Sequence, residues 1–188
     1  MKTLVLKKLT DEDLVFKIIE TNNAKLFAEL YDRFSKVVFN KCYGFSKSKE
    51  EAEDLTHDVF VRLFVKLRTF KGNSKFSTWL YSFTYNFCVN YVQRNAYKKK
   101  EKITVVTDQI KDDAFEEIDD ATLLDLKSDK LAKVLTLLEP EEKMILLMKY
   151  QDDMKIKEIM EALQVGESAV KMRIKRAKAK VLKIYDEL

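Results

Sequence analysis

The scarcity of glycine and proline is the feature that most restricts the fold of this chain. Its 188 residues include only three Gly and one Pro. Because tight turns depend heavily on these two residues, their near absence favours helices and disfavours sheets with tight turns. Hydrophobic residues make up 46% of the chain and charged residues 35%, which is typical of a globular protein. We therefore expect an all-α fold of one or two compact domains.

Apolar residues recur with helical spacing in two parts of the chain, separated by a stretch of different character. Thr10, followed by Asp-Glu-Asp, is typical of a helix N-cap, and further helical runs begin near Ser48 and near Ser77 or Thr78. Pro140 fits the first position of a later helix. We predict two small helical domains, residues 1–97 and 128–188. Residues 98–127 hold nine acidic and six basic side chains, which predicts a flexible acidic linker.

The sequence offers little for catalysis, metal binding or membrane insertion. Cys42 and Cys88 match no metal-ligand spacing, and His57 is the only histidine. No phosphate-binding glycine loop and no nucleophile with a nearby base is visible. No apolar run has the length of a secretory signal or a membrane span. We expect a cytoplasmic protein that is not an enzyme, needs no cofactor or metal, and uses its cysteines as small core residues.

A 42-residue stretch, Val59 to Lys100, contains no acidic residue but nine Lys or Arg and eleven of the 21 aromatic residues. Phosphates repel carboxylates and unstacked bases pack on rings, so this stretch favours contact with nucleic acid. The alternative is an aromatic helical core in a basic neighbourhood. On a helix over 78–97, uncharged polar side chains share an arc of about 80°. This stripe, which is either a base-reading surface or a plain solvent face, consists of Trp79, Ser82, Asn86, Asn90 and Gln93.

Residues 156–181 have the pattern of a helix-turn-helix. A short helix, Ile156–Leu163, and a four-residue turn precede a longer helix whose apolar residues form a seam. Seven basic residues and no acid lie between Ser168 and Lys183. We expect an exposed stripe that supplies phosphate and base contacts, namely Lys171, Lys175 and Lys178 with Arg173, Arg176 and Lys180 beside it. The alternative is an ordinary basic helix that is solvated or bound to an acidic partner.

Three ordered motifs resemble the bacterial sigma-70 family of initiation factors. The segment from Ala52 to Phe60, AEDLTHDVF, resembles the helix that binds core RNA polymerase. The segment from Phe70 to Tyr81, FKGNSKFSTWLY, followed by Asn86, resembles the promoter-melting and −10-reading segment. Leu138-Glu139-Pro140-Glu141 and the helix-turn-helix resemble the −35-reading domain. The plan of two domains without other sigma regions resembles the extracytoplasmic-function (ECF) group.

The resemblance implies a sigma factor that binds the clamp helices and the flap of core polymerase. It also implies recognition of duplex promoter DNA and capture of single-stranded −10 DNA. The residues implied for the clamp helices are Asp54, Leu55, Asp58 and Val59. Those implied for the −10 strand are Phe70, Lys71, Asn73, Ser74, Lys75, Trp79, Asn86 and Asn90. Those implied for the −35 duplex are Ser168, Lys171, Arg173, Lys175 and Arg176.

Several positions depart from the family pattern. Ser82 and Tyr85 stand where basic residues are common, so we expect strand contact to depend more on stacking. Gln164 replaces the usual turn Gly, and Gly166 replaces a Ser N-cap, but Gly is an acceptable cap. The alternative function is a stand-alone helix-turn-helix regulator that binds duplex DNA without replacing sigma. The resemblance also admits an anti-sigma factor as a partner.

Overall fold

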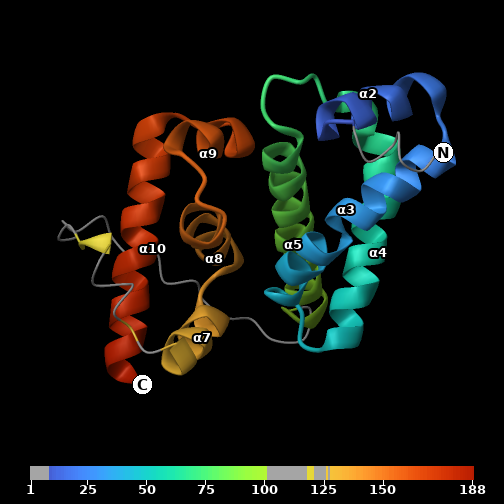
Figure 1. The fold of residues 1–188 in the computed structure, drawn as a ribbon. Coiled ribbons are helices and arrows are strands. Elements are labelled where there is room, and N and C mark those ends of the chain that lie inside the picture. The colour runs from blue at the N-terminus through green and yellow to red at the C-terminus, as the bar shows by residue number, and fades with distance from the viewer. Residues whose placement is uncertain (1–8, 101–117, 121–125, 127) are drawn as a thin grey trace. The chain divides into compact units, whose positions relative to one another are not determined.

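The computed structural model describes residues 9–100, 118–120, 126 and 128–188 (Figure 1). All regular elements within these residues are helices, which confirms the all-α expectation. The chain divides into two units, Met1–Tyr91 and Val92–Leu188. Most of the predicted acidic linker, residues 98–127, lies outside the described residues.

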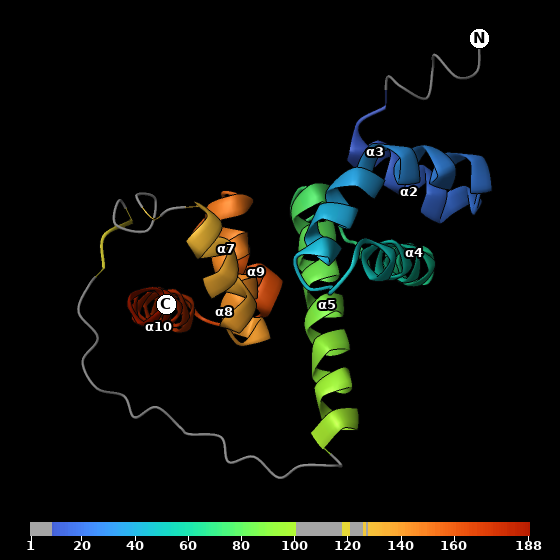
Figure 2. The same cartoon turned by 90° about the horizontal axis from the view of Figure 1, so that it is seen from below.

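The N-terminal unit is built from α2 (Asp11–Thr21), α3 (Ala24–Tyr43), α4 (Lys49–Lys66), the short 3-10 helix η1 (Leu67–Thr69) and α5 (Phe76–Lys100), whose last residues pass into the second unit. Side-chain caps begin the first three helices, because Thr10, Asn23 and Ser48 each accept a hydrogen bond from a backbone N–H in the first turn. The predicted starts at Thr10 and Ser48 are therefore confirmed. Figure 2 shows α2, α3 and α4 gathered around the first part of α5.

The core of this unit lies where the apolar faces of α2 to α5 meet. Its side chains are both aliphatic and aromatic. Fully buried members include Leu14, Leu30, Leu55, Val59, Leu63, Phe76 and Leu80. Burial of aliphatic and aromatic side chains contributes roughly 1.5 to 3 kcal/mol each, so this cluster is the main source of stability in the unit.

The start of α5 is fixed by a side chain from α2. The Phe76 backbone N–H donates a hydrogen bond to Glu12 Oε1 at 2.7 Å. This contact places the helix start one or two residues before the predicted Ser77 or Thr78, because a carboxylate 64 positions away satisfies a free N–H of the first turn. Arg33 ties α3 to α2 in the same region, with Nη1 2.8 Å from Asp11 Oδ1.

The C-terminal unit contains α7 (Ser128–Leu137), α8 (Pro140–Leu146), the π-helical turn η2 (Leu147–Gln151), α9 (Ile156–Leu163) and α10 (Glu167–Glu187). Pro140 occupies the first turn of α8, as predicted, and Glu142 Oε2 accepts the Glu139 N–H at 3.0 Å to close a capping box. Among the described residues, no helix combines the length and the apolar character that crossing a membrane requires.

Candidate functional site

The α4 helix presents two carboxylates to solvent and keeps its apolar residues inside. Asp54 and Asp58 are exposed, and His57 lies beside them on the surface. Leu55 is 2% exposed and Val59 is fully buried in the core. The prediction that these two apolar residues face a partner is therefore wrong, because residues three and four apart on α4 pack against the rest of the helical unit. The surface that α4 offers is acidic, and Leu55 and Val59 support it from beneath.

The loop between η1 and α5 is anchored at one end and exposed in the middle. Phe70 is 3% exposed, with its ring centroid 5.4 Å from that of Phe76, so this predicted base-contact residue is an anchor in the core. Gly72 has a φ of 74°, and a Cβ at that position would stand 3.0 Å from Phe16 Cζ. The loop turns there because only glycine adopts this conformation at little cost. The other predicted contact residues of the loop are accessible: Lys71, Asn73 and Lys75 are exposed, and Ser74 is half-buried.

Trp79 stands between this loop and the polar stripe on α5. Its ring stacks on that of Phe83, with centroids 5.6 Å apart and an interplanar angle of 12°, and packs edge-on against Phe70 at 5.6 Å. The ring is only partly buried. Asn86 and Asn90 are exposed farther along the helix. An aromatic ring and two uncharged amides therefore share one accessible side of α5.

One expectation about α5 is wrong. Ser82 is 7% exposed and its Oγ donates to the Thr78 carbonyl at 2.8 Å, so Ser82 is not part of the exposed stripe. Tyr85 is fully buried as well. Tyr85 contacts Lys41 of α3, a buried cation that sequence reasoning missed. Lys41 is 2% exposed, and its Nζ lies 4.0 Å from the Tyr81 ring centroid and 3.3 Å from the Tyr85 hydroxyl.

The helix-turn-helix is present, and its turn, Gln164 to Gly166, is one residue shorter than the predicted four. Ile156–Leu163 forms α9, and Gln164 follows in the left-handed conformation with a φ of 54°. Gly166 is the N-cap of α10. The predicted apolar seam is confirmed at the four positions that are at most 7% exposed, Val170, Ile174, Ala177 and Val181, while Ile184 is half-buried. The seam fixes which side of α10 turns outward.

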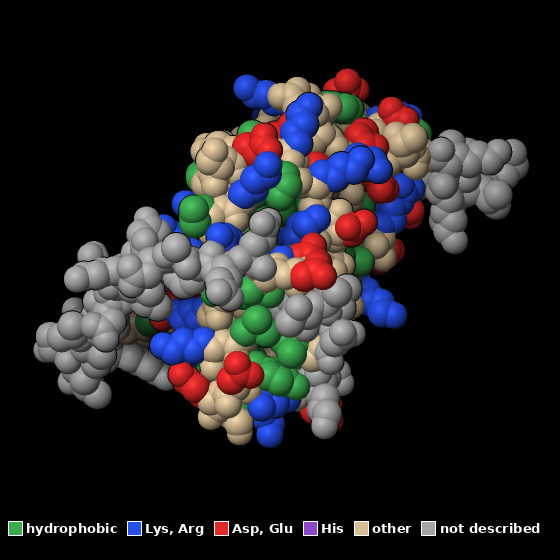
Figure 3. Space-filling view, turned by 90° about the vertical axis from the view of Figure 1, so that its left-hand side faces the viewer, with side chains coloured by type: hydrophobic (Ala, Val, Ile, Leu, Met, Phe, Trp, Pro, Cys, Tyr) green, Lys and Arg blue, Asp and Glu red, His purple; other side chains and the backbone are tan. Residues whose placement is uncertain are grey.

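The outward side of α10 is basic, but several of its cations have acidic partners. Ser168, Lys171, Arg173 and Arg176 are exposed and Lys175 is half-buried. Lys171 Nζ lies 2.7 Å from Glu167 Oε1, and Lys180 Nζ lies 2.9 Å from Glu142 Oε2. Lys178 forms an ion pair with Asp120, and its side chain is only 12% exposed, so the expectation of an exposed Lys178 is wrong. Figure 3 views the protein from the α10 side and shows Lys and Arg intermixed with Asp and Glu.

The two thiols are core residues, as predicted. Cys42 and Cys88 are both fully buried, and their sulfur atoms lie 3.8 Å apart. The Cys88 thiol donates to Cys42, which lowers the pKa of Cys42 and raises the pKa of Cys88. Across the described ranges, no three residues among His, Cys, Asp and Glu are grouped so that they could hold a metal ion.

Comparisons with known proteins find a match to the same protein family in each of the two units. Residues 30–97 match the family described as Sigma-70 region 2, and residues 128–181 match Sigma-70, region 4. The ECF RNA polymerase sigma factor SigW of Bacillus subtilis is 28% identical over 185 residues, covering 92% of this chain and 95% of SigW. The RNA polymerase sigma factor YlaC of the same species is 24% identical, covering 82% of this chain and 89% of YlaC.

Solved structures share the fold. CnrH, in complex with the cytosolic domain of CnrY, matches with a TM-score of 0.61 and 21% identity, covering 93% of this chain and 96% of CnrH. The sigma factor RpoE of Bartonella quintana, in complex with the anti-sigma factor NepR, matches with a TM-score of 0.62 and 14% identity, covering 87% of this chain and 98% of RpoE.

Proposed function

Because this chain belongs to the sigma-70 family of RNA polymerase sigma factors, in its ECF group, we propose that it binds core polymerase through α4, reads duplex DNA through α10 and holds the opened −10 strand on α5. The coarser role, a sigma factor in transcription initiation, follows from the family. The three assignments to particular surfaces are our proposal. Each rests on the exposure and chemistry of the side chains involved.

The observation that carries the proposal is the accessible side of α5. Asn86 and Asn90 are exposed amides on the same helix as the partly exposed ring of Trp79. Amides both donate to and accept from base edges, and a ring offers a stacking surface to any base. Lys71 and Lys75, exposed in the preceding loop, add positive charge where a phosphate backbone would pass. Duplex DNA keeps its base edges inside the grooves, so this surface suits an opened strand.

The α10 helix supplies the duplex-binding surface. Its buried seam holds the helix against its own unit, which leaves Ser168, Lys171, Arg173, Lys175 and Arg176 on the outward side. Lysines bind phosphates as point charges, and the planar guanidinium of arginine is suited to bidentate contact with guanine. A stand-alone helix-turn-helix regulator would use the same helix, but this second candidate assigns no role to the exposed amides of α5.

The α4 carboxylates are the proposed contact with polymerase. We expect the double replacement Asp54→Arg and Asp58→Arg to abolish co-purification with core polymerase, because two exposed charges are reversed without a core residue being touched. This pair is a sharper test than Leu55, whose truncation would open a cavity in the core. Glu20→Arg on the exposed surface of α2 is the control, and co-purification by the double variant would show that α4 is not the docking helix.

A native gel shift separates the two candidate functions. Run-off transcription with core polymerase across genomic fragments first identifies a promoter, and the shift is then measured with and without core polymerase. A sigma factor binds the promoter tightly only with core polymerase, whereas tight specific binding by the free chain favours the stand-alone regulator. We include an anti-sigma protein among the candidate partners because RpoE, a relative in fold, is in complex with one.

A further inference from the structure

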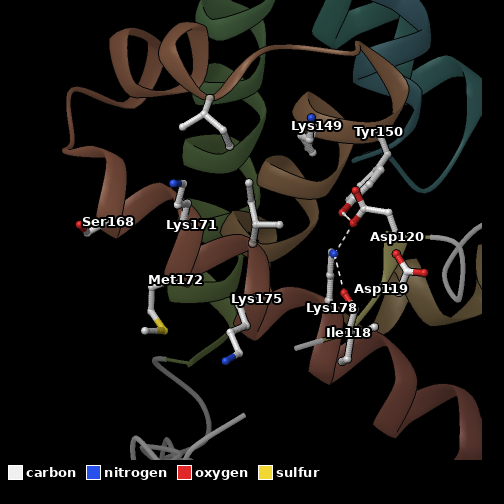
Figure 4. A pocket seen from close by; sticks show the side chains of 12 residues that line it. Ile118, Asp119, Asp120, Lys149, Tyr150, Ser168, Lys171, Met172, Lys175 and Lys178 are labelled. Atoms are coloured by element: carbon white, nitrogen blue, oxygen red, sulfur yellow. Dashed lines mark hydrogen bonds and ion pairs between the residues drawn. The ribbon is translucent and has the colours of Figure 1, made fainter. Parts of the chain in front are cut away.

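The outward side of α10 borders a groove that is already occupied in part by the chain itself. The groove has a volume of about 870 Å³ and is open to solvent. Its lining combines the first turns of α10 with η2 and with residues 118–120. We call residues 118–120 the acidic segment. Four lysines contribute to the lining, Lys149, Lys171, Lys175 and Lys178 (Figure 4). The groove is therefore a positively charged surface suited to anionic groups.

The acidic segment is held in the groove by specific hydrogen bonds. Lys178 Nζ donates to the Ile118 carbonyl at 2.8 Å and forms an ion pair with Asp120. The Tyr150 hydroxyl donates to Asp120 Oδ1 at 2.6 Å. Figure 4 shows Asp120 pointing toward both Tyr150 and Lys178. The segment thus binds through one backbone carbonyl and one carboxylate, and that carboxylate contacts both α10 and η2.

The ionisation of these groups supports the same arrangement. The hydrogen bonds from Lys178 and then from Tyr150 hold the pKa of Asp120 below its ordinary value, so the carboxylate is charged at neutral pH. Burial and then the bond to Asp120 raise the pKa of Tyr150, so its hydroxyl keeps the proton that it donates. A charged acceptor facing a neutral donor and an ammonium group forms the stronger, charge-assisted type of hydrogen bond.

We propose that the acidic segment is an internal competitor of duplex DNA for the basic side of α10. The proposal rests on the proposed duplex-binding role of α10, because Ser168, Lys171 and Lys175 line the groove that the segment enters. A phosphate backbone lying across these three side chains meets the carboxylates of Asp119 and Asp120, which repel it. DNA therefore binds α10 fully only after the segment has left the groove.

The gain in DNA affinity that follows release of the acidic segment has an upper limit. The apparent dissociation constant for DNA equals the intrinsic one divided by the fraction of molecules whose groove is open. If the segment occupies the groove in roughly nine molecules out of ten, releasing it strengthens DNA binding about tenfold. Replacing Asp120 with Asn also removes a negative charge, so a charge-matched control is required.

The test is duplex binding by the full chain, measured by fluorescence anisotropy of a labelled DNA duplex at low salt. Asp120→Asn weakens the segment's main contact, and Tyr150→Phe removes one hydrogen bond without changing any charge. Asp186→Asn is the matched control, because this exposed carboxylate lies in the last turn of α10 outside the groove lining. We expect about tenfold tighter binding for Asp120→Asn, about threefold for Tyr150→Phe and less than twofold for Asp186→Asn.

Each alternative outcome has a distinct meaning. Equal affinities of the wild type, Asp120→Asn and Tyr150→Phe, with promoter-dependent transcription by the polymerase complex intact, would overturn the competition and leave the proposed function standing. An equal gain for Asp120→Asn and Asp186→Asn, with none for Tyr150→Phe, would show a general charge effect and would also overturn it. Absence of duplex binding by every variant, together with no promoter recognition in the polymerase complex, would overturn both proposals.

Discussion

The contact between Glu12 and the start of α5 makes a sharp prediction about stability. Glu12 Oε1 accepts the Phe76 N–H at 2.7 Å, and the first turn of α5 contains no acidic residue of its own. Replacing Glu12 with Gln keeps the shape and an acceptor oxygen but removes the charge. The same carboxylate also lies in the first turn of α2, where negative charge interacts favourably with the helix dipole.

The expected magnitude follows from these two contributions. A hydrogen bond to a charged group contributes roughly 1.5 to 3 kcal/mol, and a neutral one about 1 kcal/mol. Because Gln keeps a neutral hydrogen bond, the loss is the difference between these two values, and for the half-buried Glu12 it is about 1 kcal/mol. Loss of the interaction with the α2 dipole adds about 0.5 kcal/mol. We therefore expect Glu12→Gln to lower the free energy of unfolding of this unit by about 1.5 kcal/mol.

Urea unfolding followed by tryptophan fluorescence measures this change in the right unit. Trp79 is the only tryptophan of the chain, and its ring centroid lies 5.9 Å from that of Phe76. Asp13→Asn is the matched control, because it removes an exposed charge from the same turn of α2. We expect the control to cost only about 0.5 kcal/mol. Equal losses for the two variants would refute the idea that Glu12 caps α5.

Three further predictions concern the loop, the α10 arginines and the acidic segment. Gly72→Ala should cost about 1 to 2 kcal/mol in the same unfolding experiment, because its φ is positive and the new Cβ would press on Phe16; an unchanged midpoint would contradict this. Replacing Arg173 and Arg176 with Ala should weaken −35-dependent transcription in a run-off assay, by about 1 to 3 kcal/mol for each arginine that reads a base; unchanged output would remove both from the interface. The pKa of Asp120 is lowered in the folded chain, so its contact stabilises the segment above the ordinary carboxyl pKa and is lost as pH falls through the depressed value. The NMR signals of the Tyr150 ring should therefore stay constant between about pH 7 and 5 and change only below about pH 4, and a change near pH 6 would contradict the assignment.

Features that depend on a few neighbouring residues were predictable from the sequence. The helix starts at Thr10 and Ser48, the position of Pro140 and the bounds Ile156–Leu163 all follow from capping residues and local periodicity. Such signals act within one turn of the chain, so no knowledge of tertiary packing is needed. The exposed positions of Asp54, Asp58, Asn86 and Asn90 follow from the same periodicity.

The errors arose where a partner from elsewhere in the chain decides which face is buried. Aromatic residues occur on several faces of α5, so periodicity alone does not select its core face. Tyr85 is buried against Lys41 of α3, and no local pattern marks a lysine that is 2% exposed. Phe70 was expected at the DNA because its segment resembles the family's promoter-melting segment, although its ring is held by Phe16 and Phe76. In each case the sequence pattern does not reveal the long-range contact that buries the side chain.

The same reasoning changes how the basic charge of α10 is understood. A count of residues treats its lysines as equivalent, yet the lysine side chains themselves differ in exposure. Lys171 and Glu167 are 64% and 58% exposed, so their ion pair is screened by solvent, contributes little and yields readily to a phosphate. Lys178 is only 12% exposed and also binds the Ile118 carbonyl, so displacing its partners requires a backbone segment to move. The difference between a labile pair and a docked segment is why Tyr150→Phe, which alters no charge, is the more decisive variant for testing competition at α10.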